Sequence, residues 1–156
     1  MKVNIGITEK NLQAVAEELQ KLLADEFVLY TKTRNYHWNV QGSSFMELHK
    51  LYEGQYEQLD EIMDSVAERI RQLGHFAEGQ LKDFVKLTRL GEDGYTSDHK
   101  VQLKNLLEDH ETIARNIRKN INEFTDDYKD AGSADFVTGL LKVHEQTAWF
   151  IRSYLS

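Results

Sequence analysis

The sequence N-Y-H-W-N-V-Q-G-S-S-F-M-E-L-H-K-L-Y-E (residues 35–53), continued by D-S-V-A-E (residues 64–68), contains the only ordered concentration of metal-ligand side chains in the chain. Residues four apart lie on one face of a helix, on adjacent turns, and can bind one cation together. Two such pairs occur here, with one histidine upstream of them across a glycine turn: His49 and Glu53, Asp64 and Glu68, and His37.

A helix through this stretch has an apolar stripe with spacings of three and four residues. The stripe consists of Leu48, Tyr52, Gln55, Leu59, Ile62, Val66 and Leu73. At about 100° per residue, the candidate ligands lie roughly 100–200° away from it. They are therefore expected to point out of the subunit, which is also the arrangement of any solvated helix face.

Distance decides how a metal site could form from these residues. The centres of the two pairs are 15 residues apart, or about 22 Å along a helix, whereas the ligands of one metal converge within a few ångströms. A two-fold axis near residue 58 or 59 would place one pair opposite the other pair of a second subunit. The resulting two equivalent sites, with imidazole and carboxylate ligands, suit iron, manganese or zinc better than copper(I).

The segments Y-H-W-N-V-Q-G (residues 36–42), F-M-E-L-H-K-L-Y-E (45–53) and D-S-V-A-E-R-I (64–70) resemble the signature of the Dps-like mini-ferritins. The resemblance extends over nearly the whole chain. It implies a ferroxidase centre between subunits, with ligands His37, His49 and Glu53 from one subunit and Asp64 and Glu68 from its mate. Glu53 stands where some family members have aspartate, which leaves the metal spacing open.

The resemblance also implies further features. The subunits would form a hollow dodecamer that oxidises Fe(II) with hydrogen peroxide and stores the ferric mineral. Trp38 would pack over the metal site and pass electrons. Asp135 and Glu145 would line a three-fold pore through which ferrous ions enter. Read from the residues alone, Trp38 is a core tryptophan and the two acids are surface charges.

Composition bounds the class of protein. The 156 residues fit a single domain (1–156), with a short N-terminal arm at residues 1–7, and the absence of proline with 29% charged residues favours long helices. The expected fold is all-α, a ferritin-like four-helix bundle with a short extra helix in the crossover between its second and third helices. The absence of cysteine excludes disulfides and thiolate chemistry. Without an apolar leader or span, we expect a cytoplasmic protein that does not contact membranes.

The elements expected along the chain are a helix from Thr8 to His37 or Trp38, one capped by Ser44 and running to Leu73, and a short one at Leu81–Leu87 with Leu81, Phe84 and Val85 inward. Two further helices complete the chain, and they are expected to begin after N-caps at Ser97 and Ser133. His110 is expected to be a hydrogen-bonded core residue, and His75, His99 and His144 receive no role.

Three alternatives compete with an iron oxidase. A di-iron site inside the bundle would use Glu-x-x-His motifs, and no histidine here has glutamate three residues before it. A DNA-compacting nucleoid protein is disfavoured by the net charge of −7 and by the lack of a lysine-rich arm or tail. A metal-free helical interaction module would make the ligand pattern a coincidence.

Overall fold

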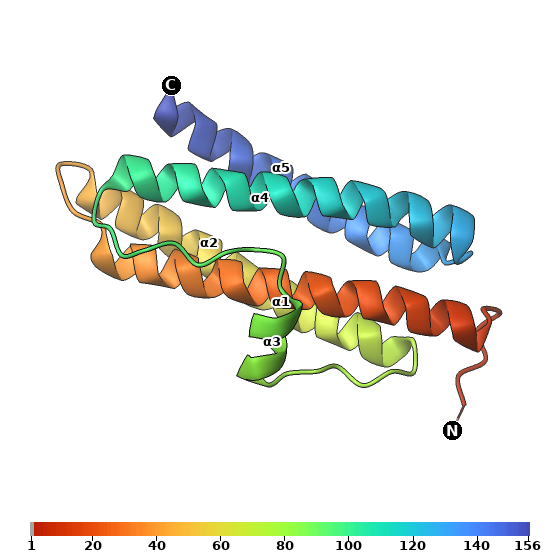
Figure 1. Cartoon of the computed structure of the whole chain (residues 1–156). Helices are drawn as coiled ribbons and strands as arrows, with labels where there is room; N and C mark the ends of the chain where they lie inside the picture. Colours follow the sequence, from red (N-terminus) through yellow and green to blue (C-terminus); the bar gives the residue numbers. More distant parts are fainter. Residues whose placement is uncertain (1) are drawn as a thin grey trace.

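The computed structural model describes residues 2–156, so the first residue of the expected N-terminal arm lies outside the described part. Two helical hairpins pack side by side, and α2 and α4 run in the same direction because a long crossover carrying a short helix connects them (Figure 1). The expected all-α bundle is confirmed. Its helices are α1 (Glu9–Asn39), α2 (Phe45–Gln72), α3 (Leu81–Leu87), α4 (His99–Asn122) and α5 (Ala131–Leu155), with a π-helical turn η1 (Glu123–Asp127) after α4.

The turn between α1 and α2 brings the ends of these two helices together. Gly42 has φ +114°, a backbone conformation that residues with a Cβ rarely adopt. Thr8 caps α1 as expected, because its hydroxyl accepts a hydrogen bond from the amide of Asn11 at 3.3 Å. Ser44 occupies the N-cap position of α2 as expected, but the expected side-chain cap is wrong, because its hydroxyl makes no capping hydrogen bond.

The other two expected caps are also wrong. Asp98, not Ser97, caps α4 by accepting from the Lys100 amide at 2.8 Å. Asp130, not Ser133, caps α5, and its carboxylate accepts from both the amide and the hydroxyl of Ser133. In both places a carboxylate lies near the serine, and a carboxylate oxygen is a stronger acceptor for helix amides than a hydroxyl oxygen.

The apolar stripe predicted on α2 is buried, and it forms one core with the inward faces of α1, α4 and α5. Only part of the prediction for α3 is confirmed. Phe84 is buried and stacks on Phe27 of α1 with ring centroids 4.3 Å apart, but Leu81 and Val85 are 69% and 72% exposed. A helix of two turns that rests on a single neighbour can bury only one narrow strip.

The crossover after α3 is fastened to α1 by buried charges. The Asp25 carboxylate accepts hydrogen bonds from Thr88 and from Arg89. Lys32 lies between Asp93 of the crossover and Asp109 of α4, at 2.7 and 2.6 Å. Within residues 2–156, no helix is long and apolar enough to cross a membrane.

Candidate metal centre

His37 and His49 come together at the closed end of the first hairpin. His37 is in the last turn of α1 and His49 in the second turn of α2, and their imidazoles stack with centroids 3.7 Å apart and planes 15° apart. Their Nδ1 atoms bond reciprocally to backbone: His37 Nδ1 to the carbonyl of His49 at 2.7 Å, and His49 Nδ1 to the carbonyl of His37 at 2.8 Å.

These two hydrogen bonds determine the tautomer of both rings. A carbonyl oxygen only accepts, so each Nδ1 must carry the hydrogen and donate it. In a neutral imidazole the other nitrogen, Nε2, then keeps its lone pair, and a metal ion needs that lone pair. The turn between α1 and α2 therefore presents two imidazole nitrogens in the form that binds metal.

The three predicted carboxylate ligands are placed unequally. Glu53 is half-buried and one turn beyond His49, whereas Asp64 and Glu68 are exposed farther along α2. Asp64 also borders a hollow of about 530 Å³ between α1, α2 and the crossover. Within residues 2–156 of one subunit, no group of three or more His, Cys, Asp or Glu side chains is close enough to hold a metal ion.

Aromatic residues continue the histidine stack in both directions. Phe45 stacks on His49 with centroids 5.0 Å apart, and Tyr56 stands perpendicular to His37 at 5.2 Å. Neither Tyr56 nor Phe45 was among the residues predicted to belong to the site. A signal was present, because positions four before and seven after His49 lie on its face of α2.

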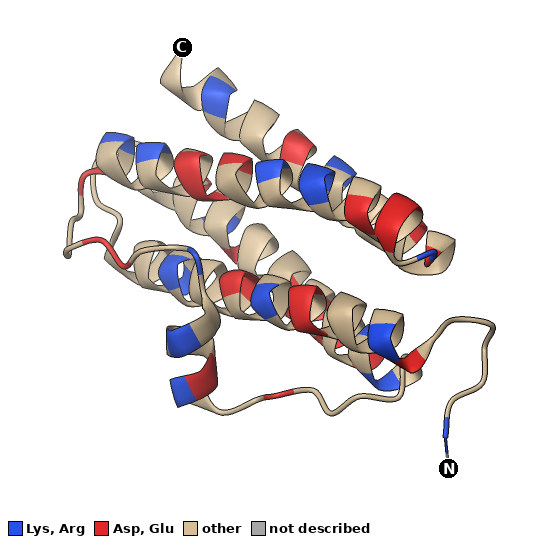
Figure 2. Ribbon diagram, turned by 45° about the vertical axis from the view of Figure 1, so that its right-hand side comes forward, with Lys and Arg blue, Asp and Glu red and all other residues tan. Residues whose placement is uncertain are grey.

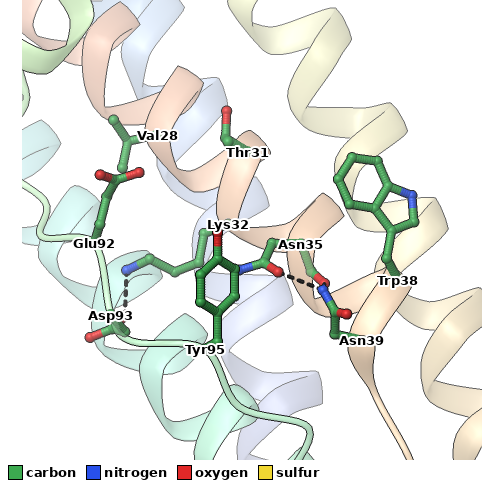
Figure 3. A pocket seen from close by; sticks show the side chains of 9 residues that line it. All are labelled: Val28, Thr31, Lys32, Asn35, Trp38, Asn39, Glu92, Asp93 and Tyr95. Atoms are coloured by element: carbon green, nitrogen blue, oxygen red, sulfur yellow. Dashed lines mark hydrogen bonds and ion pairs between the residues drawn. The ribbon is translucent and has the colours of Figure 1, made fainter.

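The Trp38 side chain is exposed on the surface of α1. Its ring is 63% exposed and lies 5.5 Å from the Arg34 guanidinium. It borders a hollow of about 330 Å³ between α1 and the crossover, together with Lys32, Asp93 and Tyr95 (Figure 3). Packing of Trp38 over a metal thus remains a prediction for an assembled site.

The predicted pore residues are both exposed on α5. Glu145 forms an ion pair with Arg118 of α4. Within one subunit, the Arg118 cation therefore lies beside one of the two predicted pore acids.

A second histidine pair lies inside the bundle. His110 Nδ1 is 2.9 Å from His144 Nδ1, and His144 Nε2 is 2.8 Å from a carboxylate oxygen of Glu26. Glu26 and His144 are completely buried and His110 is 2% exposed. Burial, and then the neighbouring His144, hold the pKa of His110 well below its usual value, so His110 is neutral. The expectation of a hydrogen-bonded core histidine is confirmed.

No spacing in the sequence indicated this buried chain, because Glu26 and His144 are 118 residues apart. His144 had received no role for that reason. Both nitrogens of His144 already contact side chains of the bundle. The buried hydrogen-bonded residues Glu26, His144 and His110 therefore do not present ligands that converge on a metal.

The chain is similar to known proteins over most of its length. Residues 16–156 match the family model described as Ferritin-like domain. The chain is 41% identical to an uncharacterised low temperature-induced protein of Nostoc, over 99% of this chain and 87% of that protein. It is 33% identical to the DNA protection during starvation protein of Helicobacter pylori, over 90% of this chain and 97% of that one.

Among solved structures, the Dps protein of Vibrio cholerae is similar with a TM-score of 0.94 and 27% identity, covering 100% of this chain and 98% of that one. That protein is described as a member of a superfamily of ferritin-like diiron-carboxylate proteins.

Proposed function

Because the chain belongs to the ferritin-like family and is a Dps-like mini-ferritin, we propose that it oxidises Fe(II) and stores the ferric product inside a hollow homo-oligomer. The observation that carries this proposal is the His37–His49 pair, in which both rings are held in the tautomer that leaves Nε2 for a metal. Iron is the substrate and the stored cargo, and the cytoplasm is the compartment in which we expect it to be handled.

The centre is proposed to form between two subunits. His37, His49 and Glu53 would come from one subunit, and Asp64 and Glu68 from its mate. Support comes from the exposure of the two acids and from the 15 residues of α2 between the pair centres, which correspond to about 22 Å. A two-fold contact along α2, within a dodecamer, would give two equivalent centres.

The proposed chemistry uses these side chains directly. Imidazole nitrogen and carboxylate oxygen both bind iron, and the carboxylate anions stabilise the additional positive charge that appears on oxidation. With hydrogen peroxide as oxidant, two Fe(II) ions each lose one electron, the O–O bond breaks, and two hydroxide ions form. Trp38 is proposed to lie near the completed centre and to pass electrons.

Subunit mixing tests the shared centre. A mixed oligomer of His49→Ala/Glu53→Ala and Asp64→Ala/Glu68→Ala subunits should contain some intact centres, so its ferrous oxidation rate should exceed that of either parent oligomer. The fraction of mixed particles is measured by native mass spectrometry. Mixed particles with no more activity than the parents would exclude the shared centre.

DNA compaction is the second candidate, because three relatives are named for DNA protection. The net charge of −7 opposes binding to a polyanion. Figure 2 shows lysine and arginine interleaved with acidic residues along the helices. We therefore expect no retention of duplex DNA in a gel-shift experiment near neutral pH and physiological salt without divalent cations.

A further inference from the structure

The candidate ligands His37 and His49 are part of a longer column of rings. Along it lie Phe45, His49, His37 and Tyr56, with successive centroid separations of 5.0, 3.7 and 5.2 Å. The first three rings are stacked, and the last contact is nearly perpendicular at 83°. Because His37 contacts His49 and Tyr56, a rotation of its imidazole must displace one of these rings.

A cation holds the Tyr56 end of the column. The Arg34 guanidinium lies 4.5 Å from the centre of the Tyr56 ring, and it donates a hydrogen bond to the Tyr30 hydroxyl at 2.7 Å. Tyr30 also meets Tyr56 edge to face, with centroids 6.2 Å apart. A guanidinium prefers the face of an aromatic ring, so this contact sets the plane of Tyr56 as well as its position.

We propose that Tyr56 is a positioning residue for the metal ligand His37, and that Arg34 holds Tyr56 in the required plane. The proposal rests on the proposed function, since the orientation of His37 matters for the binding of iron. Tyr56 acts by preserving one hydrogen bond of His37. If His37 turns, the hydrogen bond from its Nδ1 to the carbonyl of His49 is lost, and with it the tautomer that leaves Nε2 unprotonated.

The phenol hydroxyl of Tyr56 has no part in this role, since a ring suffices to confine His37. Tyr56→Phe should therefore behave like the wild type, and Tyr56→Leu should not. Arg34→Met retains much of the aliphatic length of Arg34 but removes the cation, and it should have an intermediate effect. Tyr95→Leu is the matched control, because Tyr95 is a highly exposed tyrosine outside the column.

The first measurement is binding of Co²⁺ to the assembled, metal-free protein. Loss of a group that orients a metal ligand weakens binding by about 10–100-fold, and we expect a loss of that size in Tyr56→Leu. Tyr56→Phe and Tyr95→Leu should stay close to the wild type. In ferrous oxidation, Tyr56→Leu should raise the Fe(II) concentration at half-maximal rate and change the maximal rate little.

The second measurement needs no metal. Deuterium exchange at the C2 position of each histidine, followed by mass spectrometry, reports how accessible its ring is to solvent, and a confined ring is less accessible than a released one. In Tyr56→Leu and Arg34→Met we expect faster exchange at His37 and unchanged exchange at His110. Unchanged exchange at His37 in both variants would overturn the proposal.

The outcomes separate this proposal from the proposed function. A wild-type protein that neither binds Co²⁺ nor oxidises Fe(II) would contradict the proposed function, and histidine exchange would still decide the role of Tyr56. If the wild type is active and Tyr56→Phe loses as much as Tyr56→Leu, the phenol itself participates and positioning by the ring is wrong.

Discussion

His37 and His49 meet between α1 and α2, and His110 and His144 meet between α4 and α5, yet the two pairs have different partners. In the outer pair each Nδ1 donates to a backbone carbonyl, which leaves the lone pair of both Nε2 atoms available to a metal ion. In the inner pair the rings bond to each other and to Glu26, and all three side chains are buried. The atom that accepts the first hydrogen bond thus decides whether a histidine pair can serve metal chemistry or only packing.

The largest effect on stability should follow from breaking the buried hydrogen bonds between Glu26, His144 and His110. His144→Ala leaves the Glu26 carboxylate buried without its partner, and removal of one member of a buried pair costs about 3–5 kcal/mol. We expect the midpoint of thermal unfolding of the metal-free protein to fall by roughly 6–20 °C. His49→Ala is the control with a smaller loss, about 1–2 kcal/mol. Equal losses would mean that the two pairs do not differ in their contribution to stability.

The outer pair should instead control the chemistry. His37→Ala or His49→Ala removes a proposed ligand and should lower the initial ferrous oxidation rate by about 100-fold or more, equivalent to about 2.7 kcal/mol. His144→Gln, assayed as folded oligomer below its unfolding temperature, should keep most of the wild-type rate. The comparison fails if the inner variant loses as much activity per folded particle as the outer ones.

Asp109, beside His110 on α4, extends the comparison to a buried ion pair. Burial raises its pKa to about 6 even though Lys32 opposes the shift. Burial alone would lower the pKa of Lys32, but its hydrogen bonds to Asp109 and Asp93 outweigh this and raise it. The two shifts differ in what they imply: the carboxylates stabilise the Lys32 cation, while ionisation of Asp109 remains unfavourable in the fold.

The sign of the pH dependence follows from the Asp109 shift. Its pKa in the fold is above the unfolded value of about 3.9, so its contribution to stability is complete below about pH 4 and is lost as the pH rises through 6. Asp109→Asn should remove this dependence. We expect the unfolding midpoint of the variant relative to wild type to rise by several degrees between about pH 4 and about pH 7. A constant difference would show that Asp109 is not responsible.

The smallest effect is expected at the proposed iron entry. Asp135→Asn/Glu145→Gln should slow initial ferrous oxidation at low salt by about three- to five-fold, because the acids concentrate cations. Wild type should lose rate as salt screens this attraction, and the variant should respond little. Arg118→Gln releases Glu145 from its ion pair and should raise the rate at low salt. An unchanged rate in the double variant would exclude entry at these residues.

Much of the outer arrangement could be predicted because it depends on local spacing. The buried stripe of α2 and the outward direction of Asp64 and Glu68 follow from 3.6 residues per turn. The caps of α4 and α5 were assigned to the wrong residues, because several polar side chains near each start could accept the same amides. Likewise, two of the three α3 residues expected inward are exposed, since their direction depends on which helix supports α3.

By itself the sequence determined the all-α class, the helix positions within a few residues and the shared helix face of each proposed ligand pair of α2, because each depends on residues close together in the chain. Only the tertiary structure decided that Glu26 meets His144 and that His37 lies between His49 and Tyr56. These contacts join separate helices, and helical periodicity gives the direction of a side chain but not the identity of the residue that it meets. Packing of whole helices selects that residue.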